Sequence, residues 1–262
     1  MLTSLKNPKI QQARKLWKRG ERDRTDHFLI EGYRELSRAC ASSYKVELLF
    51  TCSSLFLGSH EPRLIENLQK SGAIVFPCSE PVFRKLSYRD RPDGLIGVAK
   101  QRHCSLEDLK VQERALFVVA EAVEKPGNLG TILRSADATG VDGVIVCDRG
   151  TDIHNPNVVR ASVGTLFTTP VVEVESQKAR DWLKENNIMT LAATPLSQTD
   201  YTQIDLTKPI AIVMGTEQYG LSEAWMEKAD IQVRIPMLGQ ADSLNVAMAT
   251  TVLLYETLRQ RT

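Results

Sequence analysis

The chain has 262 residues, of which 42% are hydrophobic and 25% are charged, so it can bury a sizeable core. Its 33 Lys and Arg residues face 32 Asp and Glu residues; this near balance excludes a uniformly basic tail but allows a local basic patch. The five Cys and four His residues form no metal-binding pattern, and no apolar run approaches a membrane span or a secretory signal. We therefore expect no bound metal, no membrane contact and a cytoplasmic protein.

The first 25 residues form a strongly basic stretch, with eight Lys and Arg residues against two Asp and Glu residues. The segment 8–20 is predicted to be a helix, because Ile10, Ala13 and Leu16 recur along it at helical spacing. The other face of this helix is basic. That face fits either a solvated surface or a phosphate-binding surface, and both interpretations stay open.

Short strands and helices alternate along the rest of the chain. Strands at 46–51 and 73–77, with a helix at 63–70 between them, indicate a small α/β domain, and the charged stretch 100–114 is predicted to be a linker. In the second half, strands are predicted at 116–122, 143–147, 170–174, 188–193, 209–214 and 231–236, and helices at 129–139, 157–166, 177–186, 223–228 and 244–258. This alternation predicts a mostly parallel sheet with helices on both faces.

Two stretches of the second half combine Gly residues with polar side chains just after predicted strands. The stretch 128–134 opens a helix, and Asn128 is placed as its N-cap. The stretch 214–222 contains Gly215 and Gly220, which allow close backbone approach at a strand end, where α/β sheets bind ligands. Each stretch alone also fits an ordinary helix cap or loop.

A third stretch, 235–247, leads into the last helix, which is apolar on nearly all sides and is therefore expected to be buried. Ser243 is predicted to be the N-cap of this helix. Asn245 would then lie in the first turn of a buried helix, where its side chain must find a hydrogen-bond partner. Taken alone, both residues also fit cap and core roles.

Together and in this order, the three stretches resemble the motifs of the SpoU (TrmH-like) group of SPOUT RNA 2′-O-ribose methyltransferases. The resemblance covers residues 114–262 well, and residues 25–100 are similar, more weakly, to the L30e-like substrate-binding domain of that family. Many relatives carry an acidic residue before the Pro of the first motif, whereas here Lys125 stands before Pro126. The matches are N-x-G-x-I-x-R over Asn128–Arg134, Gly215-Thr216-Glu217 with Gly220, and Ile235-Pro236-Met237 through Ser243-Leu244-Asn245.

The resemblance implies an α/β fold with two domains. Residues 1–105 would form the L30e-like RNA substrate-binding domain with its basic helix, and residues 113–262 a parallel-sheet SPOUT domain with a deep trefoil knot. It also implies S-adenosyl-L-methionine as the cofactor and a homodimer with the site at its interface. The implied cofactor contacts are Thr194, Met214, Gly215, Glu217, Gly220, Ile235, Met237, Ser243 and Leu244.

The implied reaction moves a methyl group from a sulfonium to a ribose 2′-oxygen, whose hydroxyl must lose its proton around the transition state. Arg134 corresponds to the base proposed for the family. Because a guanidinium is not normally deprotonated, stabilisation of a developing alkoxide or binding of the neighbouring phosphate is an equal alternative. Asn128, Glu217, Ser243 and Asn245 would orient the reacting groups. The implied RNA contacts are Lys15, Lys18, Arg19, Arg22, Arg24, Arg89 and Arg91.

Three functions are compatible with these features. Methylation of ribosomal RNA is favoured over transfer RNA, since transfer-RNA-modifying relatives generally lack the first domain. A non-catalytic RNA-binding protein with a decayed knot is the second, although the complete set of motif residues argues against it. A nucleotide-dependent Rossmann enzyme is the third, and the missing G-x-G-x-x-G counts against it.

Overall fold

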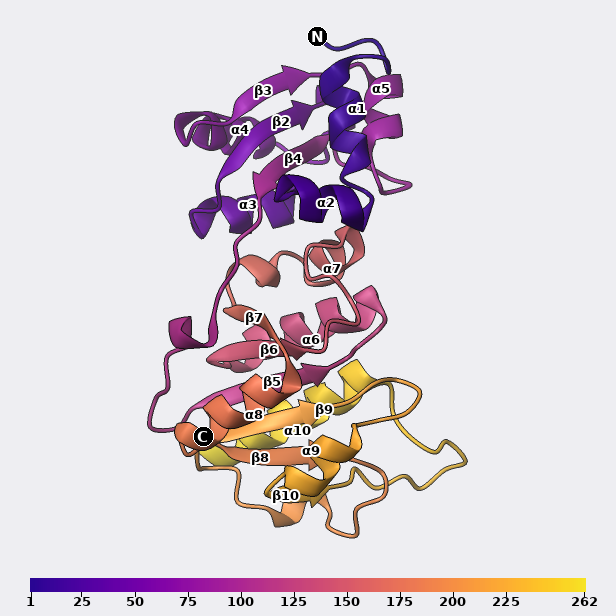
Figure 1. Ribbon diagram of the computed structural model, residues 1–262. Helices are drawn as coiled ribbons and strands as arrows, with labels where there is room; N and C mark the ends of the chain where they lie inside the picture. The colour runs from indigo at the N-terminus through magenta and orange to yellow at the C-terminus, as the bar shows by residue number, and fades with distance from the viewer. The chain divides into compact units, whose positions relative to one another are not determined.

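The computed structural model describes residues 1–262, which form two compact units (Figure 1). Unit 1 comprises Met1–Arg102 and Asp152–Thr168, and unit 2 comprises His103–Thr151 and Thr169–Thr262. The sequence predicts two contiguous domains, whereas in the structure a segment from the second half of the chain packs with unit 1. That segment contributes the Phe167 ring, whose centroid lies 4.8 Å from that of Tyr44, so it completes an aromatic cluster of unit 1.

Unit 1 is built on a four-stranded sheet in the order β1-β4-β2-β3. β4 (Leu95–Lys100) is antiparallel to both β1 (His27–Glu31) and β2 (Val46–Thr51), and β2 is parallel to β3 (Ile74–Pro77). The predicted strands β2 and β3 are confirmed, whereas β1 and β4 were not predicted as strands. The helices of unit 1 are α1 (Pro8–Lys15), α2 (Arg19–Thr25), α3 (Tyr33–Ala41), η1 (Ser53–Leu55), α4 (Glu61–Lys70), α5 (Glu80–Leu86), α7 (Pro156–Ala161) and η3 (Thr165–Phe167).

In place of the single predicted helix 8–20, the structure has the two helices α1 and α2. A buried arginine stabilises the turn between them. Arg22, only 1% exposed, donates hydrogen bonds to the carbonyl oxygens of Leu16 (2.8 Å) and Trp17 (2.9 Å), just after α1 ends. Its guanidinium also pairs with the Asp152 carboxylate at 2.6 Å. The expectation that Arg22 contacts RNA is therefore wrong, because its charge is buried and already paired.

Arg22→Ala is expected to lower the free energy of unfolding of unit 1 by about 3–5 kcal/mol, since it removes the guanidinium that offsets the charge of the buried Asp152 carboxylate. Burial alone would raise the pKa of Asp152, but the Arg22 guanidinium and the backbone N–H of His154 hold the pKa below its ordinary value. The stabilisation is therefore present at neutral pH and is lost as the pH falls below about 4.

Denaturant titration at pH 7 and at pH 3.5 measures both effects. The exposed neighbour Arg24 provides the control, and Arg24→Ala should change stability by less than about 1 kcal/mol. Equal stability of the Arg22 and Arg24 variants at pH 7 would show that the buried pair does not hold unit 1 together.

Unit 2 is built on a six-stranded sheet in the order β10-β8-β9-β5-β6-β7, with every neighbouring pair parallel. This confirms the predicted parallel α/β fold; the trefoil knot stays a prediction. The strands are β5 (Leu116–Glu121), β6 (Gly143–Cys147), β7 (Val171–Val174), β8 (Met189–Ala193), β9 (Ile210–Met214) and β10 (Ile231–Val233). The helices are η2 (Leu106–Asp108), α6 (Pro126–Thr139), α8 (Ser176–Glu185), η4 (Tyr201–Gln203), α9 (Glu223–Lys228) and α10 (Val246–Arg261).

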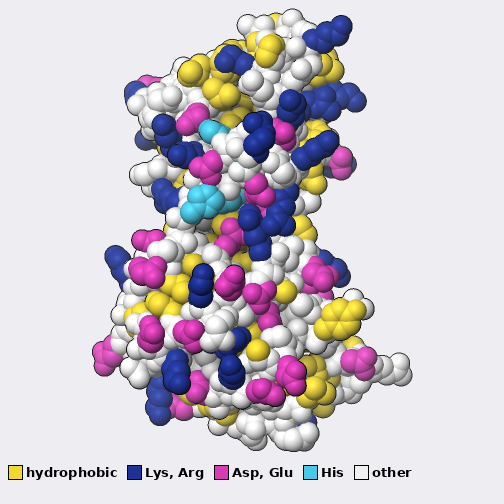
Figure 2. Space-filling view, in the orientation of Figure 1, with side chains coloured by type: hydrophobic (Ala, Val, Ile, Leu, Met, Phe, Trp, Pro, Cys, Tyr) yellow, Lys and Arg dark blue, Asp and Glu magenta, His cyan; other side chains and the backbone are white.

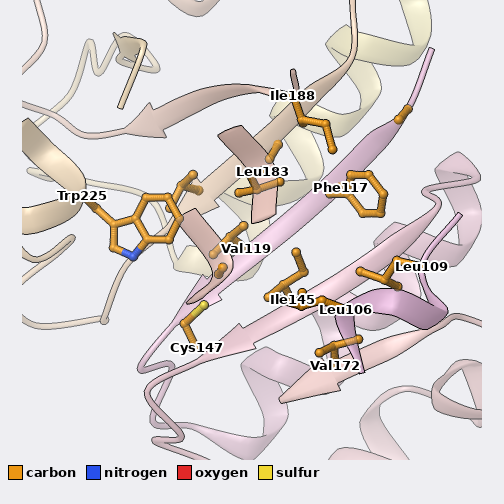
Figure 3. Packing of buried hydrophobic residues seen from close by; sticks show 14 residues of the cluster. Leu106, Leu109, Phe117, Val119, Ile145, Cys147, Val172, Leu183, Ile188 and Trp225 are labelled. Atoms are coloured by element: carbon orange, nitrogen blue, oxygen red, sulfur yellow. The ribbon is translucent and has the colours of Figure 1, made fainter. Parts of the chain in front are cut away.

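Helices cover both faces of this sheet. On one face, Phe117 and Val119 of β5 pack with Leu183 of α8 and Trp225 of α9 in a continuous core (Figure 3). On the other, α10 packs against α6 and against β9. Leu106 also enters the first core, so part of the predicted linker 100–114 is an ordered piece of unit 2. None of the helices is both long and apolar enough to cross a membrane.

Candidate active site

A cavity of about 520 Å³ lies at the carboxyl ends of β8, β9 and β10. In parallel α/β sheets this edge is where ligands bind, because the loops that follow the strands converge there. Three loops form most of the wall: 194–196 after β8, 215–221 after β9 and 235–245 after β10. All nine predicted cofactor contacts line this one cavity: Thr194, Met214, Gly215, Glu217, Gly220, Ile235, Met237, Ser243 and Leu244.

The loop after β9 is a tight turn that requires glycine at both ends. Thr216 and Gly220 exchange backbone hydrogen bonds of 2.9 and 3.2 Å, which close the turn. A Cβ atom on Gly215 would lie 2.2 Å from the carbonyl carbon of Gly220, closer than any real contact. Gly220 has φ +71°, a left-handed conformation that favours glycine. The two glycines thus allow the chain to fold back directly against the cavity.

Three polar side chains from separate stretches of the sequence meet beside this loop. Asn128 of α6 donates to the Glu217 carboxylate at 2.6 Å, and Asn245 donates to the Asn128 side-chain oxygen at 3.1 Å. Glu217 also accepts the backbone N–H groups of Glu124 and Lys125, both at 3.2 Å. Glu217 therefore ties the loop after β9 to the start of α6 and, through Asn128, to the start of α10.

The negative charge of Glu217 is part of this arrangement. Burial alone would raise the pKa of its carboxyl, but the hydrogen bonds from Asn128 and the backbone outweigh burial and hold the pKa below its usual value. Glu217 is therefore a carboxylate at neutral pH. With three donors already bonded to it, its evident role is to position the loops.

Two predicted helix caps are wrong by a few residues. Lys125 is the N-cap of α6, so Asn128 lies within the first turn and its side chain is available to Glu217. Asn245, and not Ser243, is the N-cap of α10, and its side-chain oxygen accepts the N–H of Ala247 at 3.0 Å. The expectation that Asn245 must find a partner is confirmed, because it caps α10 and also binds Asn128.

Arg134 lies apart from the other predicted catalytic residues. It is exposed on α6 and is not among the residues that line the cavity, whereas Ser243 and Asn245 are. Its neighbour Ser135 hydrogen-bonds Thr251 of α10 at 2.6 Å, so Arg134 lies where α6 runs alongside α10. Further residues line the cavity, among them Leu196, Tyr219 and Lys125, the last of which the sequence marked only as a departure from the family motif. Lys125 stands beside a recognised motif and Tyr219 stands within one. That position was the signal by which the sequence could have identified them as cavity residues.

The near-neutral charge of the chain hides opposite charges on the two units. Unit 1 holds 20 Lys and Arg against 12 Asp and Glu, a net charge of +8, and the remainder, 13 against 20, gives unit 2 a net charge of −7. Figure 2 shows Lys and Arg side chains gathered over unit 1. Among the predicted RNA contacts, Lys15, Lys18, Arg19, Arg24 and Arg91 are exposed.

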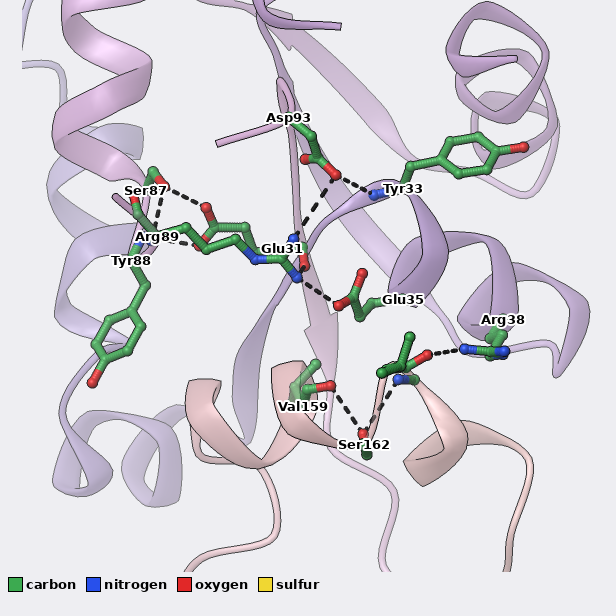
Figure 4. A network of polar contacts seen from close by, with 12 residues as sticks. Glu31, Tyr33, Glu35, Arg38, Ser87, Tyr88, Arg89, Asp93, Val159 and Ser162 are labelled. Atoms are coloured by element: carbon green, nitrogen blue, oxygen red, sulfur yellow. Dashed lines mark hydrogen bonds and ion pairs between the residues drawn. The ribbon is translucent and has the colours of Figure 1, made fainter. Parts of the chain in front are cut away.

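Arg89, like Arg22, is used inside unit 1 and is not exposed. Its Nη2 donates to the Glu35 carboxylate at 2.5 Å and to the Glu31 carbonyl oxygen at 2.6 Å (Figure 4). Its side chain is only 20% exposed. The expectation that Arg89 contacts RNA is therefore not supported, since the guanidinium already binds two groups of the fold.

Comparison with known proteins relates both parts of the chain to RNA-modifying enzymes. Residues 115–255 match the SpoU rRNA Methylase family, and residues 7–97 match the MRM3-like substrate binding domain. The chain is 32% identical to the 23S rRNA (uridine(2479)-2'-O)-methyltransferase of Streptomyces viridochromogenes, over 98% of this chain and 91% of the relative. It is 31% identical to the 23S rRNA (guanosine(2553)-2'-O)-methyltransferase RlmP of Bacillus subtilis (strain 168), over 97% of both chains.

Solved structures agree with these matches. The crystal structure of an AdoMet-bound rRNA methyltransferase from Sinorhizobium meliloti superimposes with a TM-score of 0.91 at 32% identity, over 98% of this chain and 97% of the other. The likeness extends over both units, since neither alone accounts for that coverage. The chain thus belongs to the SpoU rRNA Methylase family.

Proposed function

We propose that this protein transfers a methyl group from S-adenosyl-L-methionine to a ribose 2′-hydroxyl of ribosomal RNA. The observation that carries the proposal is that the second and third motif stretches line one cavity, while the first is joined to both of them through Asn128, which bonds Glu217 and Asn245. The named relatives of similar length are 23S rRNA 2'-O-methyltransferases, which favours ribosomal over transfer RNA. As an enzyme of ribosomal RNA, it would act in the cytoplasm. Methyl transfer to unmodified ribosomal RNA tests the proposal.

The cavity suits S-adenosyl-L-methionine in size and lining. Its volume of about 520 Å³ lies in the range of small-molecule sites. Met214, Ile235 and Leu244 offer apolar surface for an adenine ring, and the glycines after β9 bring backbone groups close to the ligand. When bound, the cofactor supplies an electrophilic methyl group on a sulfonium. As the methyl group leaves, the sulfonium becomes a neutral thioether and the 2′-hydroxyl releases its proton to water, so the residues around the cofactor hold the acceptor oxygen in line and stabilise its developing charge.

The polar cluster of Asn128, Glu217 and Asn245 orients the reacting groups, and Arg134 stabilises the charge on the acceptor oxygen. Glu217, Asn128 and Asn245 fix the loop after β9 relative to the starts of α6 and α10, and oriented reactants can gain about 7–11 kcal/mol from positioning alone. Arg134 is exposed and carries a fork of N–H donors, which suits both a ribose oxygen gaining negative charge and the adjacent phosphate. We assign it electrostatic stabilisation of the developing alkoxide, because a guanidinium is a very weak acid.

A homodimer would explain why Arg134 does not line the cavity of its own subunit. On α10, Met248 is 63% exposed and Tyr255 is 50% exposed, and their spacing places both on one side of the helix, next to α6. Large apolar side chains exposed together are typical of an interface. A second copy covering this face of α6 and α10 would bring Arg134 of one subunit to the cavity of its partner.

Mixed dimers of two inactive variants are expected to recover activity. An Arg134→Ala subunit keeps an intact cavity, and a Gly215→Val subunit keeps an intact Arg134, so each mixed dimer contains one complete site if the site is shared. Co-expressing the two variants with different affinity tags allows the mixed dimer to be purified and assayed for methyl transfer. If Arg134 instead serves the cavity of its own subunit, the mixed dimer will be as inactive as either parent.

Unit 1 is proposed to supply most of the RNA affinity through its positive charge. Replacing Lys15, Lys18 and Arg19 with Gln should reduce the slope of log affinity against log salt by about one unit for each phosphate that is no longer bound. Filter-binding titrations from 50 to 300 mM salt (about physiological at the midpoint) measure this slope. Lys178 and Lys184 on α8 of unit 2 form the control, since their replacement should leave the slope unchanged. An unchanged slope in the unit 1 variant would mean that α1 and α2 present only a solvated face.

A further inference from the structure

Two side chains at the cavity wall have no part in the proposed machinery. Tyr219 lies on the closed turn after β9 and is 79% exposed, and Lys125 is the exposed N-cap residue of α6. Both line the cavity. The cavity edge thus presents an aromatic ring and an ammonium group to solvent.

Tyr219 is held on a rigid support. Its backbone N–H donates to the Thr216 hydroxyl at 3.0 Å, within the turn that Thr216 and Gly220 close by reciprocal backbone hydrogen bonds. A ring that is 79% exposed contributes little to the core, so packing does not explain it. A flat, exposed ring on a fixed turn loses little conformational freedom when another flat ring stacks on it.

Lys125 places an exposed ammonium group at the start of α6. The N-terminus of a helix carries a partial positive charge, and at α6 the Glu217 carboxylate, not a residue of the first turn, offsets it. Glu217 binds the backbone N–H of Lys125 at 3.2 Å and so fixes the start of α6 at the cavity wall. Because Glu217 already occupies the helix end, the exposed Lys125 ammonium is the group at this wall that can pair with a further anion.

We propose that Tyr219 and Lys125 form the subsite for the acceptor nucleotide, with the base stacked on Tyr219 and a backbone phosphate paired with Lys125. The inference rests on the proposed function, since it takes the cavity to hold the methyl donor. A ribonucleotide is the ligand that combines a flat aromatic base with a nearby phosphate, which matches the two side chains. The subsite lies on unit 2, so it adds local recognition to the charge of unit 1.

Steady-state methyl transfer and equilibrium RNA binding test the subsite in the full-length protein. Tyr219→Ala should raise the KM for RNA by about 5- to 100-fold, the usual range for loss of one stacked base, and Tyr219→Phe should remain near wild type. Lys125→Ala should reduce the salt slope of RNA binding by about one. Neither substitution should change the Kd for S-adenosyl-L-methionine. Leu57→Ala, at a side chain that is 84% exposed on unit 1, and Lys184→Ala on α8 serve as controls.

The outcomes separate this inference from the function on which it rests. If wild-type protein transfers methyl groups but Tyr219→Ala behaves as Leu57→Ala does, the subsite is wrong and the function stands. A raised Kd for S-adenosyl-L-methionine in Lys125→Ala, with the salt slope unchanged, would assign Lys125 to the cofactor carboxylate and overturn the inference. Weaker dimerisation of Tyr219→Ala, measured by sedimentation equilibrium, would assign the ring to a second copy. Absence of methyl transfer by the wild type would contradict the proposed function itself.

Discussion

Arg134→Ala and Arg134→Lys are both expected to lower the rate of methyl transfer by at least about 10²–10³-fold, the usual loss for one preorganised donor to a developing oxyanion. The lysine variant keeps the charge but offers a single point donor in place of the planar fork. Because Arg134 is exposed and does not line the cavity, cofactor affinity and thermal stability should be almost unchanged in both variants.

Single-turnover kinetics with saturating RNA isolate the chemical step from binding. Arg114 provides a matched control, since it is an exposed arginine that precedes β5 at the end of the strand opposite to the cavity. Arg114→Ala should retain the wild-type rate. Substantial activity in Arg134→Ala would contradict the mechanism, and full activity in Arg134→Lys would show that charge alone suffices.

Gly215→Val is expected to abolish detectable cofactor binding, and Gly215→Ala to weaken it strongly. Any side chain at this position places a Cβ atom 2.2–2.3 Å from backbone atoms of Gly220 and Leu221. Because those atoms belong to the backbone, the whole turn must move, and it carries Glu217 and one wall of the cavity with it.

Isothermal titration with S-adenosyl-L-methionine measures the loss, and thermal unfolding checks that the variants fold. Gly20→Ala on α2 is the control, since a Cβ atom there meets nothing within 4 Å. A folded Gly215→Val protein with wild-type affinity would show that the loop after β9 does not form the cofactor site.

The elements of unit 2 were predicted well because short-range signals determine them, whereas the residues of its cavity were predicted through the family resemblance. Apolar runs mark the parallel strands, and the residues that follow β8, β9 and β10 must meet at one edge of the sheet. The positions of helix caps were predicted less accurately. Asn245 and Ser243 are both good capping residues two positions apart, and the bond between Asn245 and Asn128, residues far apart in the chain, favours one of them.

Burial of charge was the feature that the sequence could not reveal. Arg22 and Arg89 look like their exposed neighbours along the chain, yet each is neutralised by a carboxylate distant in sequence, Asp152 and Glu35 respectively. The pairing of Arg22 depends on the packing of residues 152–168 with unit 1, and no local sequence pattern predicts that packing. For the same reason, deleting residues 1–102 would remove Arg22 and with it the buried ion pair to Asp152, so point substitutions test RNA binding more cleanly than truncation.

Mass spectrometry of ribosomal RNA methylated by the purified protein tests the central claim most directly. Unmodified ribosomal RNA is incubated with S-adenosyl-L-methionine carrying a labelled methyl group, and the digested nucleosides are then analysed. The account predicts one labelled 2′-O-methyl nucleoside, and an RNA with a 2′-deoxy sugar at that position should bind but accept no label. Label on a base, or transfer to the deoxy substrate, would contradict ribose 2′-O-methylation by this protein.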